Sequence, residues 1–386
     1  MTITILCAGA LALPGGADDD ARPALLARHA PPEGGPLARL LARARAPRHR
    51  RDDALTPREL PDEAWLRERF GAEPGASIAA HAAHAIGGTA QPIAGGAGQA
   101  EAAGPRDRPT PAALPALLVR PVHLHVGLDH LVLAVPQADE IEAVEAAALA
   151  EAANVLFADD GLLWSADAPH AWTLRATTDA GRARLEALGG LACRSARLAS
   201  GRNIDAWQPE GDAARAWRAI VNELQMLWFQ HPVNLAREAA GRPVLNSAWL
   251  EGRPGIAGVR AFDAVVTADD AVAGIALSAG SEVSALDPMA SADDFVRMVA
   301  IQENADTVLL DPGWWRLAVS RADPLAWREG WTRLDALVER LAAAGETVEA
   351  ILLAGERDLV EFSPRPSDRW ALWRRRSLAA LLAAHR

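Results

Sequence analysis

Three short apolar segments separated by amphipathic helical patterns constrain the fold of this chain more than any other feature. The segments are Ala264–Thr267, Thr307–Asp311 and Ala350–Ala354, and the helical patterns cover Asp269–Ala279, Ser291–Glu303 and Pro324–Ala344. A further apolar segment, Thr2–Ala8, predicts a buried strand at the start of the sequence. Because parallel strands need crossover connections, such alternation is typical of a mostly parallel sheet covered by helices. We therefore expect an α/β protein with a mostly parallel, helix-covered sheet.

The middle of the chain has strand patterns of another kind. Leu117–Val126 alternates apolar and polar residues, and Leu131–Val135 and Asn246–Leu250 predict two further strands. A small antiparallel meander around 154–176 is predicted from three short segments: Val155–Ala158, Leu162–Ser165 and Trp172–Ala176. Helical patterns cover Asp139–Ala153, Ala180–Leu188, Asp212–Gln230 and Asn234–Ala240. We expect the meander to be an insertion in the main domain.

Composition divides the chain into three expected parts. Residues 1–71 hold the first strand and helices of the main α/β domain, with helical patterns at Pro36–Ala46 and Pro61–Phe70. Residues 72–114 are rich in Ala, Gly and Pro and offer little to pack, so we expect a flexible connection. Residues 115–386 form the rest of the main domain. A final helix at Ser367–His385, basic on one side and apolar on the other, is expected to dock onto this body.

A cluster of arginines, a pair of histidines and two Asp-Pro pairs each have a simple structural interpretation, and the first two also have a functional one. Arg45–Arg51 contains four arginines, and it is either a solvated loop, which is simpler, or a patch that contacts phosphate. His81 and His84 lie at helical spacing, and they are either surface histidines, again simpler, or part of a metal ligand set. The Asp-Pro pairs at 311–312 and 323–324 are interpreted as turn and helix-start residues.

The residue types that are missing exclude several kinds of chemistry. The chain has no lysine and no tyrosine, which excludes a Schiff-base lysine, a P-loop lysine and a tyrosine acid. Its 39 basic and 50 acidic residues give a net charge of −11, which argues against a nucleic-acid or anionic-membrane partner. Two cysteines, Cys7 and Cys193, cannot form a disulfide framework, and we expect two buried thiols rather than one bridge. No Walker A, G-x-S-x-G or H-E-x-x-H motif is present.

The apolar segments also bear on location. Met1–Pro14 lacks a positively charged region, so we expect the buried strand Thr2–Ala8 there rather than a signal sequence. No other apolar run approaches the roughly 20 residues that span a bilayer. We therefore expect a cytoplasmic protein with no membrane partner.

The first group of residues that could carry chemistry is His123-x-His125-x-x-x-Asp129-His130. Residues two apart on a strand point to the same side, so His123 and His125 share a face. With a carboxylate and a third imidazole after the turn at Gly127, the group could supply zinc-type ligands. In the simpler interpretation, the group lines a polar pocket or forms a hydrogen-bond network. We take His123, Asp129 and His130 as candidate catalytic residues and assign no metal ligand.

The second group lies around the end of the helix at 212–230. His231, Asn234 and Arg237 stand where this helix meets the next one, whose first main-chain N–H groups favour an anion. Glu223 projects from the flank of the first helix, and Asn246 precedes a strand. These five residues are candidate substrate-binding residues. In the simpler interpretation, buried Asn and His side chains satisfy loose main-chain groups at the junction.

Two runs of residues carry a resemblance to a known family: Asn222-Glu-Leu-Gln-Met-Leu…His231-Pro-Val-Asn-x-x-Arg237…Gly241…Asn246-Ser-x-Trp-Leu-x-Gly252, and Arg120-Pro-x-His…Val126-Gly-x-Asp129-His130. They resemble bacterial proteins called RpfE-type regulatory proteins, which are often labelled cofactor-independent phosphoglycerate mutases. Their rhythm is also similar to that of the archaeal-type independent phosphoglycerate mutases. The resemblance covers most of residues 115–360 and is most specific around 204–252.

This resemblance implies an alkaline-phosphatase-like α/β fold and an isomerase that interconverts 3-phosphoglycerate and 2-phosphoglycerate. Such an enzyme would work through two divalent metals and a phosphorylated serine. The chain departs from the family at three expected ligand positions, which read Cys7-Ala8-Gly9-Ala10, Asp311-Pro-Gly-Trp-Trp and Gly355-Glu356-Arg357. The family has an aspartate after the first strand and aspartate–histidine pairs after the two later strands. Arginine stays protonated and cannot ligate a metal.

We therefore expect a phosphoglycerate mutase-like scaffold whose bimetal centre has been lost. The expected protein is non-catalytic, needs no cofactor, and binds a small phosphorylated metabolite or acts as a regulator. The alternative is an active mutase or metal-dependent phosphatase whose divalent-metal ligands have moved to His123, His125, Asp129 and His130. A third interpretation is a different enzyme or an interaction module. The sequence leaves the oligomeric state and the physiological ligand open.

Overall fold

The computed structural model describes residues 1–12, 14, 35–44, 47–73, 77–86, 116–127, 130–302, 304–365 and 367–368. The chain forms two compact units. The first unit is Met1–Pro74 with Gly255–Arg386, and the second unit is Gly75–Pro254. These boundaries differ from the expected ranges, because the end of the second unit falls inside the expected domain 115–386. The physical reason is that residues 117–252 build a sheet and a hydrophobic core of their own.

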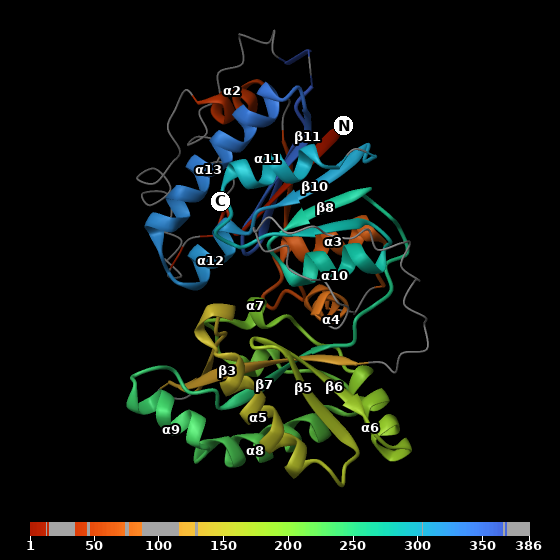
Figure 1. Ribbon diagram of the computed structural model, residues 1–386, viewed down its shortest axis with the longest axis vertical. Helices are drawn as coiled ribbons and strands as arrows, with labels where there is room; N and C mark the ends of the chain where they lie inside the picture. Colours follow the sequence, from red (N-terminus) through yellow and green to blue (C-terminus); the bar gives the residue numbers. More distant parts are fainter. Residues whose placement is uncertain are drawn as a thin grey trace, which may run out of the picture. The chain divides into compact units, whose positions relative to one another are not determined.

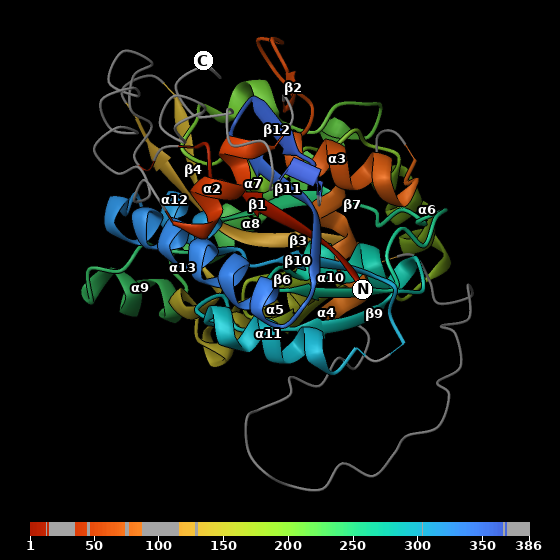
Figure 2. The same ribbon diagram turned by 90° about the horizontal axis from the view of Figure 1, so that it is seen from above.

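The first unit contains a seven-stranded sheet with the strand order β2-β12-β11-β1-β10-β8-β9. Its strands are β1 (Thr2–Ala8), β2 (Arg48–Arg51), β8 (Ala264–Thr267), β9 (Glu282–Ala285), β10 (Thr307–Asp311), β11 (Thr347–Ala354) and β12 (Asp358–Phe362). The strands from β11 to β9 run parallel, whereas β12 and β2 add an antiparallel edge. Figure 2 shows β2 and β12 together at this edge. The predicted α/β class with a mostly parallel sheet is confirmed.

Helices cover both faces of this sheet. They are α2 (Pro36–Arg43), α3 (Pro61–Phe70), α10 (Asp270–Ser278), α11 (Ala292–Ala300), α12 (Trp314–Ser320) and α13 (Pro324–Ala343). In Figure 1, α2, α11, α12 and α13 lie on one side of the strands and α3 and α10 on the other. The longest helix, α13, begins where Pro324 follows Asp323, whose carboxylate accepts hydrogen bonds from the main-chain N–H groups of Leu325 and Ala326. The Asp-Pro pair at 323–324 is thus a helix start, as the sequence predicts.

The core of the first unit lies between the sheet and α11 to α13. Ile3, Ile5 and Cys7 point into it from alternate positions of β1, as the two-residue period of a strand requires. The Trp315 and Trp331 rings meet edge to face with their centroids 5.2 Å apart. Gly330 makes this contact possible, because a Cβ atom at that position would lie 2.8 Å from the Trp315 ring.

The second unit is built on a five-stranded antiparallel sheet, in which β4-β3-β6-β5 are consecutive and β7 also pairs with β3. The strands are β3 (Leu117–Val126), β4 (Leu131–Ala134), β5 (Leu162–Ala168), β6 (Ala171–Ala176) and β7 (Ser247–Gly252). The α-helices are α4 (Ala82–Ile86), α5 (Ala143–Leu156), α6 (Asp179–Gly189), α7 (Ala196–Ala199), α8 (Ala214–Phe229) and α9 (Pro232–Ala239). Short 3₁₀ turns occupy η1 (Ile78–His81), η2 (Ala138–Glu140) and η3 (Ile204–Trp207). The second core lies between this sheet and α5, α6 and α8, which contribute Leu149, Leu185 and Leu224.

One predicted strand is wrong. Val155–Ala158 is not the first strand of a meander, because Val155 and Leu156 are the last residues of α5 and a turn follows them. The Asn154 side chain takes the place of a neighbouring strand beside β5: it accepts a hydrogen bond from the Trp164 N–H (2.7 Å) and donates one to the Trp164 carbonyl (3.0 Å). A helix end therefore satisfies main-chain groups that the sequence pattern assigned to a third strand.

Two further expectations are corrected. Arg48–Arg51 is a strand paired with β12 rather than a loop, although all of its residues are exposed. His81 is fully buried in η1 rather than at the surface. The expected flexible connection at 72–114 lies mostly outside the described residues, and within it Ile78–His81 and Ala82–Ile86 are helical. The expected final helix, Ser367–His385, lies outside the described residues except for its first two positions. In the described part of the chain, no helix is both long and apolar enough to cross a bilayer.

Candidate functional site

The carboxyl ends of the parallel strands in the first unit bring charged residues together. Parallel strands end at the same edge of a sheet, and ligands of open α/β sheets bind at that edge. Asp311 is the last residue of β10, and Asp269 follows β8 closely. Because β8 and β10 are neighbours in the sheet, their ends lie side by side. This edge is therefore the first place to look for chemistry.

Asp311 is the centre of this edge and is fully buried. Its Oδ2 atom accepts hydrogen bonds from the Thr267 hydroxyl (2.7 Å) and from the Nη1 atom of Arg316 (2.8 Å). The Thr267 hydroxyl oxygen in turn accepts from the Asp269 N–H at 2.9 Å. Asp269 also caps α10 through its Oδ1 atom, so its position is fixed by the start of that helix.

Arg316 lies among three carboxyl groups. Besides the bond to Asp311, its Nε atom is 3.7 Å from Asp269 Oδ2 and its Nη2 atom is 3.9 Å from Asp62 Oδ2. Asp62 is a buried residue in the first turn of α3. Arg316 itself stands in the first turn of α12, which begins after Gly313 in a left-handed conformation (φ +68°). We call Asp62, Asp269, Asp311 and Arg316 the strand-end cluster.

Burial and mutual interaction set the charges of the strand-end cluster. Burial raises the pKa of Asp311, and the Arg316 guanidinium opposes this rise. Burial alone would lower the pKa of Arg316, but Asp311, Asp269 and Asp62 raise it above its ordinary value. Cys7 lies under the cluster at the end of β1, and its pKa is well above the ordinary value because of burial and the Asp311 charge. Arg316 is therefore a permanent cation, and Cys7 stays a thiol.

Two polar atoms of the strand-end cluster have no partner among the described residues. These are Oδ1 of Asp311 and Nε of Arg316, both of which are inaccessible. A buried polar atom without a hydrogen bond costs free energy, so well-packed proteins keep few of them. The cluster is thus incompletely satisfied, unlike the other buried charges described below.

The donor set at this edge does not fit the two divalent metals that the family resemblance implies. A guanidinium group occupies the space between the carboxylates, and it repels a cation and cannot ligate one. In the described ranges, no three His, Cys, Asp or Glu side chains converge on one metal position. The sequence analysis does not predict Arg316 as a site residue, because it interprets Asp311-Pro312 only as a turn. The available signal was an aspartate that ends a buried apolar strand.

The predicted catalytic residues of the second unit lie at one end of β3. His123 and His125 share a strand face, with ring centroids 6.3 Å apart. The Nδ1 atom of His123 lies 2.9 Å from the Val244 carbonyl, and since a carbonyl only accepts, Nδ1 carries the proton. Burial lowers the pKa of His123, so its ring is neutral near pH 7. His130 is exposed just before β4, and Asp129 lies outside the described residues.

The predicted substrate-binding residues Asn234 and Arg237 are buried in α9. Asn234 donates to the carbonyls of Trp228 and Leu245, each at 2.9 Å, and accepts from the Leu245 N–H at 2.8 Å. Arg237 donates to the Pro243 carbonyl (2.8 Å) and to the Glu145 carboxylate (2.6 Å). Their polar groups thus join α9 to the end of α8, to α5 and to the segment before β7, as the simpler interpretation of this junction expects.

The other three predicted substrate-binding residues are dispersed. His231 caps α9 by accepting from the Val233 N–H at 3.3 Å, and burial lowers its pKa. Asn246 is bonded on both sides of its amide to the main chain of Leu124, at 2.7 and 3.0 Å. Glu223 lies exposed on α8. The structure does not bring these residues to one pocket with Asn234 and Arg237.

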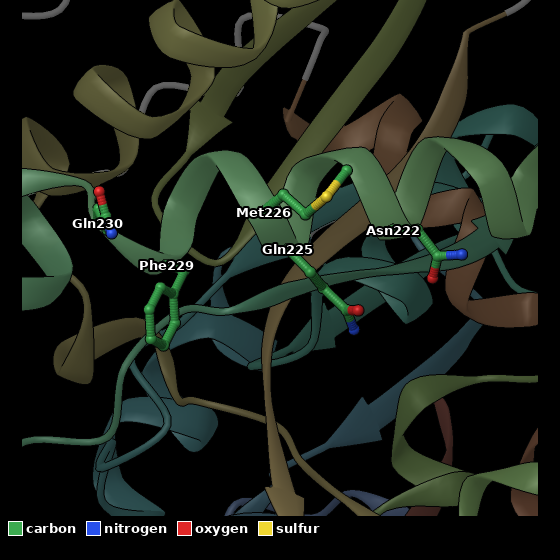
Figure 3. Close-up of a pocket in the computed structure, with 5 residues that line it drawn as sticks. All are labelled: Asn222, Gln225, Met226, Phe229 and Gln230. Atoms are coloured by element: carbon green, nitrogen blue, oxygen red, sulfur yellow. The ribbon is translucent and has the colours of Figure 1, made fainter.

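A shallow depression does lie on the solvent side of α8 (Figure 3). It is lined by Asn222, Gln225, Met226, Phe229 and Gln230, and the Met226 and Phe229 side chains are 72% and 75% exposed. No charged side chain lines it. Its residues come from one helix, so it offers no converging groups for catalysis.

Comparisons with known proteins give a fold and no family. No protein-family model matches the chain, and no curated protein matches it. Among solved structures, it is similar to the PH0037 protein from Pyrococcus horikoshii, with 13% identity over 94% of this chain and 87% of that chain and a TM-score of 0.50. Another similar structure is a cofactor-independent phosphoglycerate mutase from Thermoplasma acidophilum, with 13% identity over 98% of this chain and 94% of that chain and a TM-score of 0.44. At such identities, the likeness to PH0037 shows a shared fold alone.

Proposed function

We propose that this protein is a phosphoglycerate mutase-like binding or regulatory protein that takes a small phosphorylated metabolite without a bimetal centre. One observation carries the proposal: Arg316 lies among Asp62, Asp269 and Asp311 at the strand ends. A divalent cation here would have to displace a permanently charged guanidinium that is itself bonded to Asp311. The cluster holds the ends of β8 and β10 to α3 and α12, and its arginine stands where a divalent cation would need to bind.

The phosphorylated ligand follows from the family resemblance and from composition. The resemblance implies a ligand of the phosphoglycerate class. Since the chain has no lysine, a cationic contact to phosphate must come from arginine or protonated histidine. Arginine suits this role because its guanidinium binds phosphate oxygens bidentately. A binding protein of this kind therefore needs accessible arginines at its ligand site.

The alternative is an active mutase or phosphatase with a divalent metal on His123, His125, Asp129 and His130. The observation in its favour is the hydrogen bond from Nδ1 of His123 to Val244, which leaves the Nε2 lone pair of a neutral ring available. A main-chain carbonyl behind an imidazole is a usual support for a metal ligand. This alternative predicts metal-dependent turnover that needs His123.

The deciding experiment measures turnover and metal content on the same purified protein. Conversion of 3-phosphoglycerate is followed in an enolase-coupled assay with Mg²⁺, Mn²⁺ or Zn²⁺ added, and bound metals are counted by mass spectrometry. We expect no turnover above background, metal well below one equivalent, and binding of 3-phosphoglycerate in calorimetry. His123→Ala is the matched variant, and it should leave that binding unchanged.

Two results would overturn the proposal. Turnover that disappears in His123→Ala, together with metal near one or two equivalents, would establish the alternative. Failure to bind 3-phosphoglycerate at all would remove the ligand class from the proposal.

A further inference from the structure

A groove in the first unit gathers arginines at the antiparallel edge of the sheet. Its volume is about 590 Å³, within the usual range for small-molecule sites. Its lining includes Arg48 and Arg50 from β2, Arg69 from α3, and Arg365 after β12. Thr4 of β1, which is 6% exposed, also lines it from the sheet. Residues of β11 complete the lining, so the groove is formed by five segments of the first unit.

The strand period explains why two of the β2 arginines reach the groove. Successive side chains of a strand point to opposite sides. His49 and Arg51 turn toward Asp358, with contacts of 2.8 and 3.9 Å, and neither lines the groove. Arg48 and Arg50 therefore face the other side. The pairing of β2 with β12 fixes this orientation, because it sets the register residue by residue.

The guanidinium groups of the groove are not all neutralised by carboxylates. Arg50 is paired with Glu68 at 2.6 Å, and Arg48 is only 4.0 Å from Glu361 while its side chain is 83% exposed. Arg69 stacks over the Phe262 ring, with its Cζ atom 5.5 Å from the centroid, and forms no ion pair with a described residue. This stacking holds the guanidinium in place while its N–H groups remain available.

The remaining charges of the groove define what else a ligand must carry. Arg365 is exposed and forms no ion pair with a described residue. Glu349 also lines the groove, is exposed and has no ion-pair partner in the described part of the chain. Among the described residues, guanidinium groups without an ion-pair partner thus line the same groove as a carboxylate without one. An anion alone would satisfy only the arginines, whereas a hydroxyl group would donate a hydrogen bond to the carboxylate.

We propose that this groove is the binding site for a small phosphorylated hydroxy compound, with its phosphate on Arg69, Arg365 and Arg48 and a hydroxyl on Glu349. This inference rests on the proposed function, because the assumption that the ligand carries a phosphate comes from there. Phosphate accepts hydrogen bonds in a fork that matches the guanidinium group. In this proposal, Arg48 and Arg50 of β2 line a ligand site rather than belonging to a solvated surface without a ligand.

The test is calorimetric titration of the full chain with 3-phosphoglycerate, glycerate and inorganic phosphate at fixed ionic strength. We expect 3-phosphoglycerate to bind most tightly, inorganic phosphate more weakly, and glycerate weakest. The double variant Arg69→Met/Arg365→Met should weaken 3-phosphoglycerate binding by about tenfold or more, since charge-assisted hydrogen bonds are lost. Glu349→Gln should weaken binding of 3-phosphoglycerate more than binding of inorganic phosphate, so the difference in affinity between the two probes should become smaller.

Arg51→Met is the matched control. It removes one arginine charge from β2, on the side of that strand that faces away from the groove. The affinity of this variant for 3-phosphoglycerate should therefore stay within twofold of the wild type. Circular dichroism melts establish that each variant is folded. If the double variant binds as tightly as the wild type, the groove is overturned while the proposed function stands. If the wild type binds none of the three probes, the ligand class of the proposed function fails and the groove proposal fails with it.

Discussion

Two regions of the molecule bury charged and polar side chains, and they do so in different ways. At the junction of α8, α9 and β7, Asn234 is hydrogen-bonded through its amide oxygen and twice through its amide nitrogen to main-chain groups. In the strand-end cluster, the Asp311 carboxylate and the Arg316 guanidinium are bonded to one another, and each has one buried atom without a hydrogen-bond partner among the described residues. Complete satisfaction by the main chain is typical of a structural junction. Buried charges that are only partly hydrogen-bonded, as in the strand-end cluster, cost free energy that the junction does not pay.

This contrast shows that residue type alone does not identify a site. The junction contains the Asn, His and Arg residues that a phosphate site would use, yet Asn234 and Arg237 face the chain's own carbonyls. The strand-end cluster is built from aspartates that the sequence presents as turn and cap residues. The ligand-binding assignment of the junction residues stays a prediction, and the following variants separate the two regions.

The largest effect is expected from Arg316→Met. The substitution leaves Asp311 buried without its counter-ion, so the free energy of unfolding should fall by about 3–5 kcal/mol. Urea denaturation monitored by tryptophan fluorescence measures this change. Arg328→Met, which removes an exposed charge from α13, is the control and should change stability by no more than about 0.5 kcal/mol.

A double variant tests whether the loss comes from the unpaired charge. Asp311→Asn/Arg316→Met removes both charges, and its loss should be smaller than the sum of the two single losses. Additive losses would show that Arg316 and Asp311 do not act as a pair. A loss below about 1 kcal/mol in Arg316→Met would mean that the strand-end cluster is not a buried charge cluster in solution.

The second effect concerns Asn234→Ala. This change leaves the Leu245 N–H and the carbonyls of Leu245 and Trp228 without partners, which should cost about 2–4 kcal/mol. Affinity for 3-phosphoglycerate, measured on the folded variant by calorimetry, should stay within twofold of the wild type. An affinity loss of tenfold with little change in stability would instead place the ligand at the junction.

The parallel strands could be predicted because burial on both faces leaves a plain sequence signal. β1, β8 and β10 have the predicted bounds, since each is a short apolar run. β9 lacks this signal, because its residues Glu282–Ala285 are exposed or half-buried at the edge of the sheet. β2 was hidden for the same reason: its four residues are polar and exposed, and only pairing with β12 makes them a strand.

The strand-end cluster could not be predicted because its members meet only in the folded chain. Asp62 comes from α3, whereas Asp311 and Arg316 follow about 250 residues later, so no local spacing links them. The sequence predicts that the metal ligands implied by the resemblance are absent after β1, β10 and β11. What fills their place depends on the rotation of α12 after Gly313, which is a tertiary property.

A third expected effect tests whether a buried polar side chain without hydrogen bonds also affects the stability of the second unit. Both ring nitrogens of His81 are buried without a partner among the described residues, and burial, with a smaller effect of His84, lowers its pKa to about 3. An unfolded histidine has a pKa of about 6.5, so the unfolded state binds a proton between these values and the folded state does not. Stability from the neutral ring is therefore complete above pH 6.5 and is lost as the pH falls, by about 2 kcal/mol at pH 5.

His81→Leu isolates this contribution. The variant should be at least as stable as the wild type at pH 7, because no hydrogen bond is lost, and it should lose less stability between pH 7 and pH 5. Urea denaturation of both proteins at pH 7, 6 and 5 gives the difference and cancels the other titrating groups. Equal pH profiles would show that His81 is accessible or paired in solution.

The smallest effect is expected from Glu223→Gln, and it completes the comparison. Glu223 is exposed on α8 and makes no hydrogen bond or ion pair with a described residue, so stability should change by less than about 0.5 kcal/mol. Affinity for 3-phosphoglycerate should likewise stay within twofold, measured beside the double variant of the arginine groove. A tenfold loss of affinity in Glu223→Gln would indicate direct contact with the ligand, because the change at this exposed carboxylate should not affect folding. That result would place the ligand site at α8, with the buried residues Asn234 and Arg237 supporting it from α9.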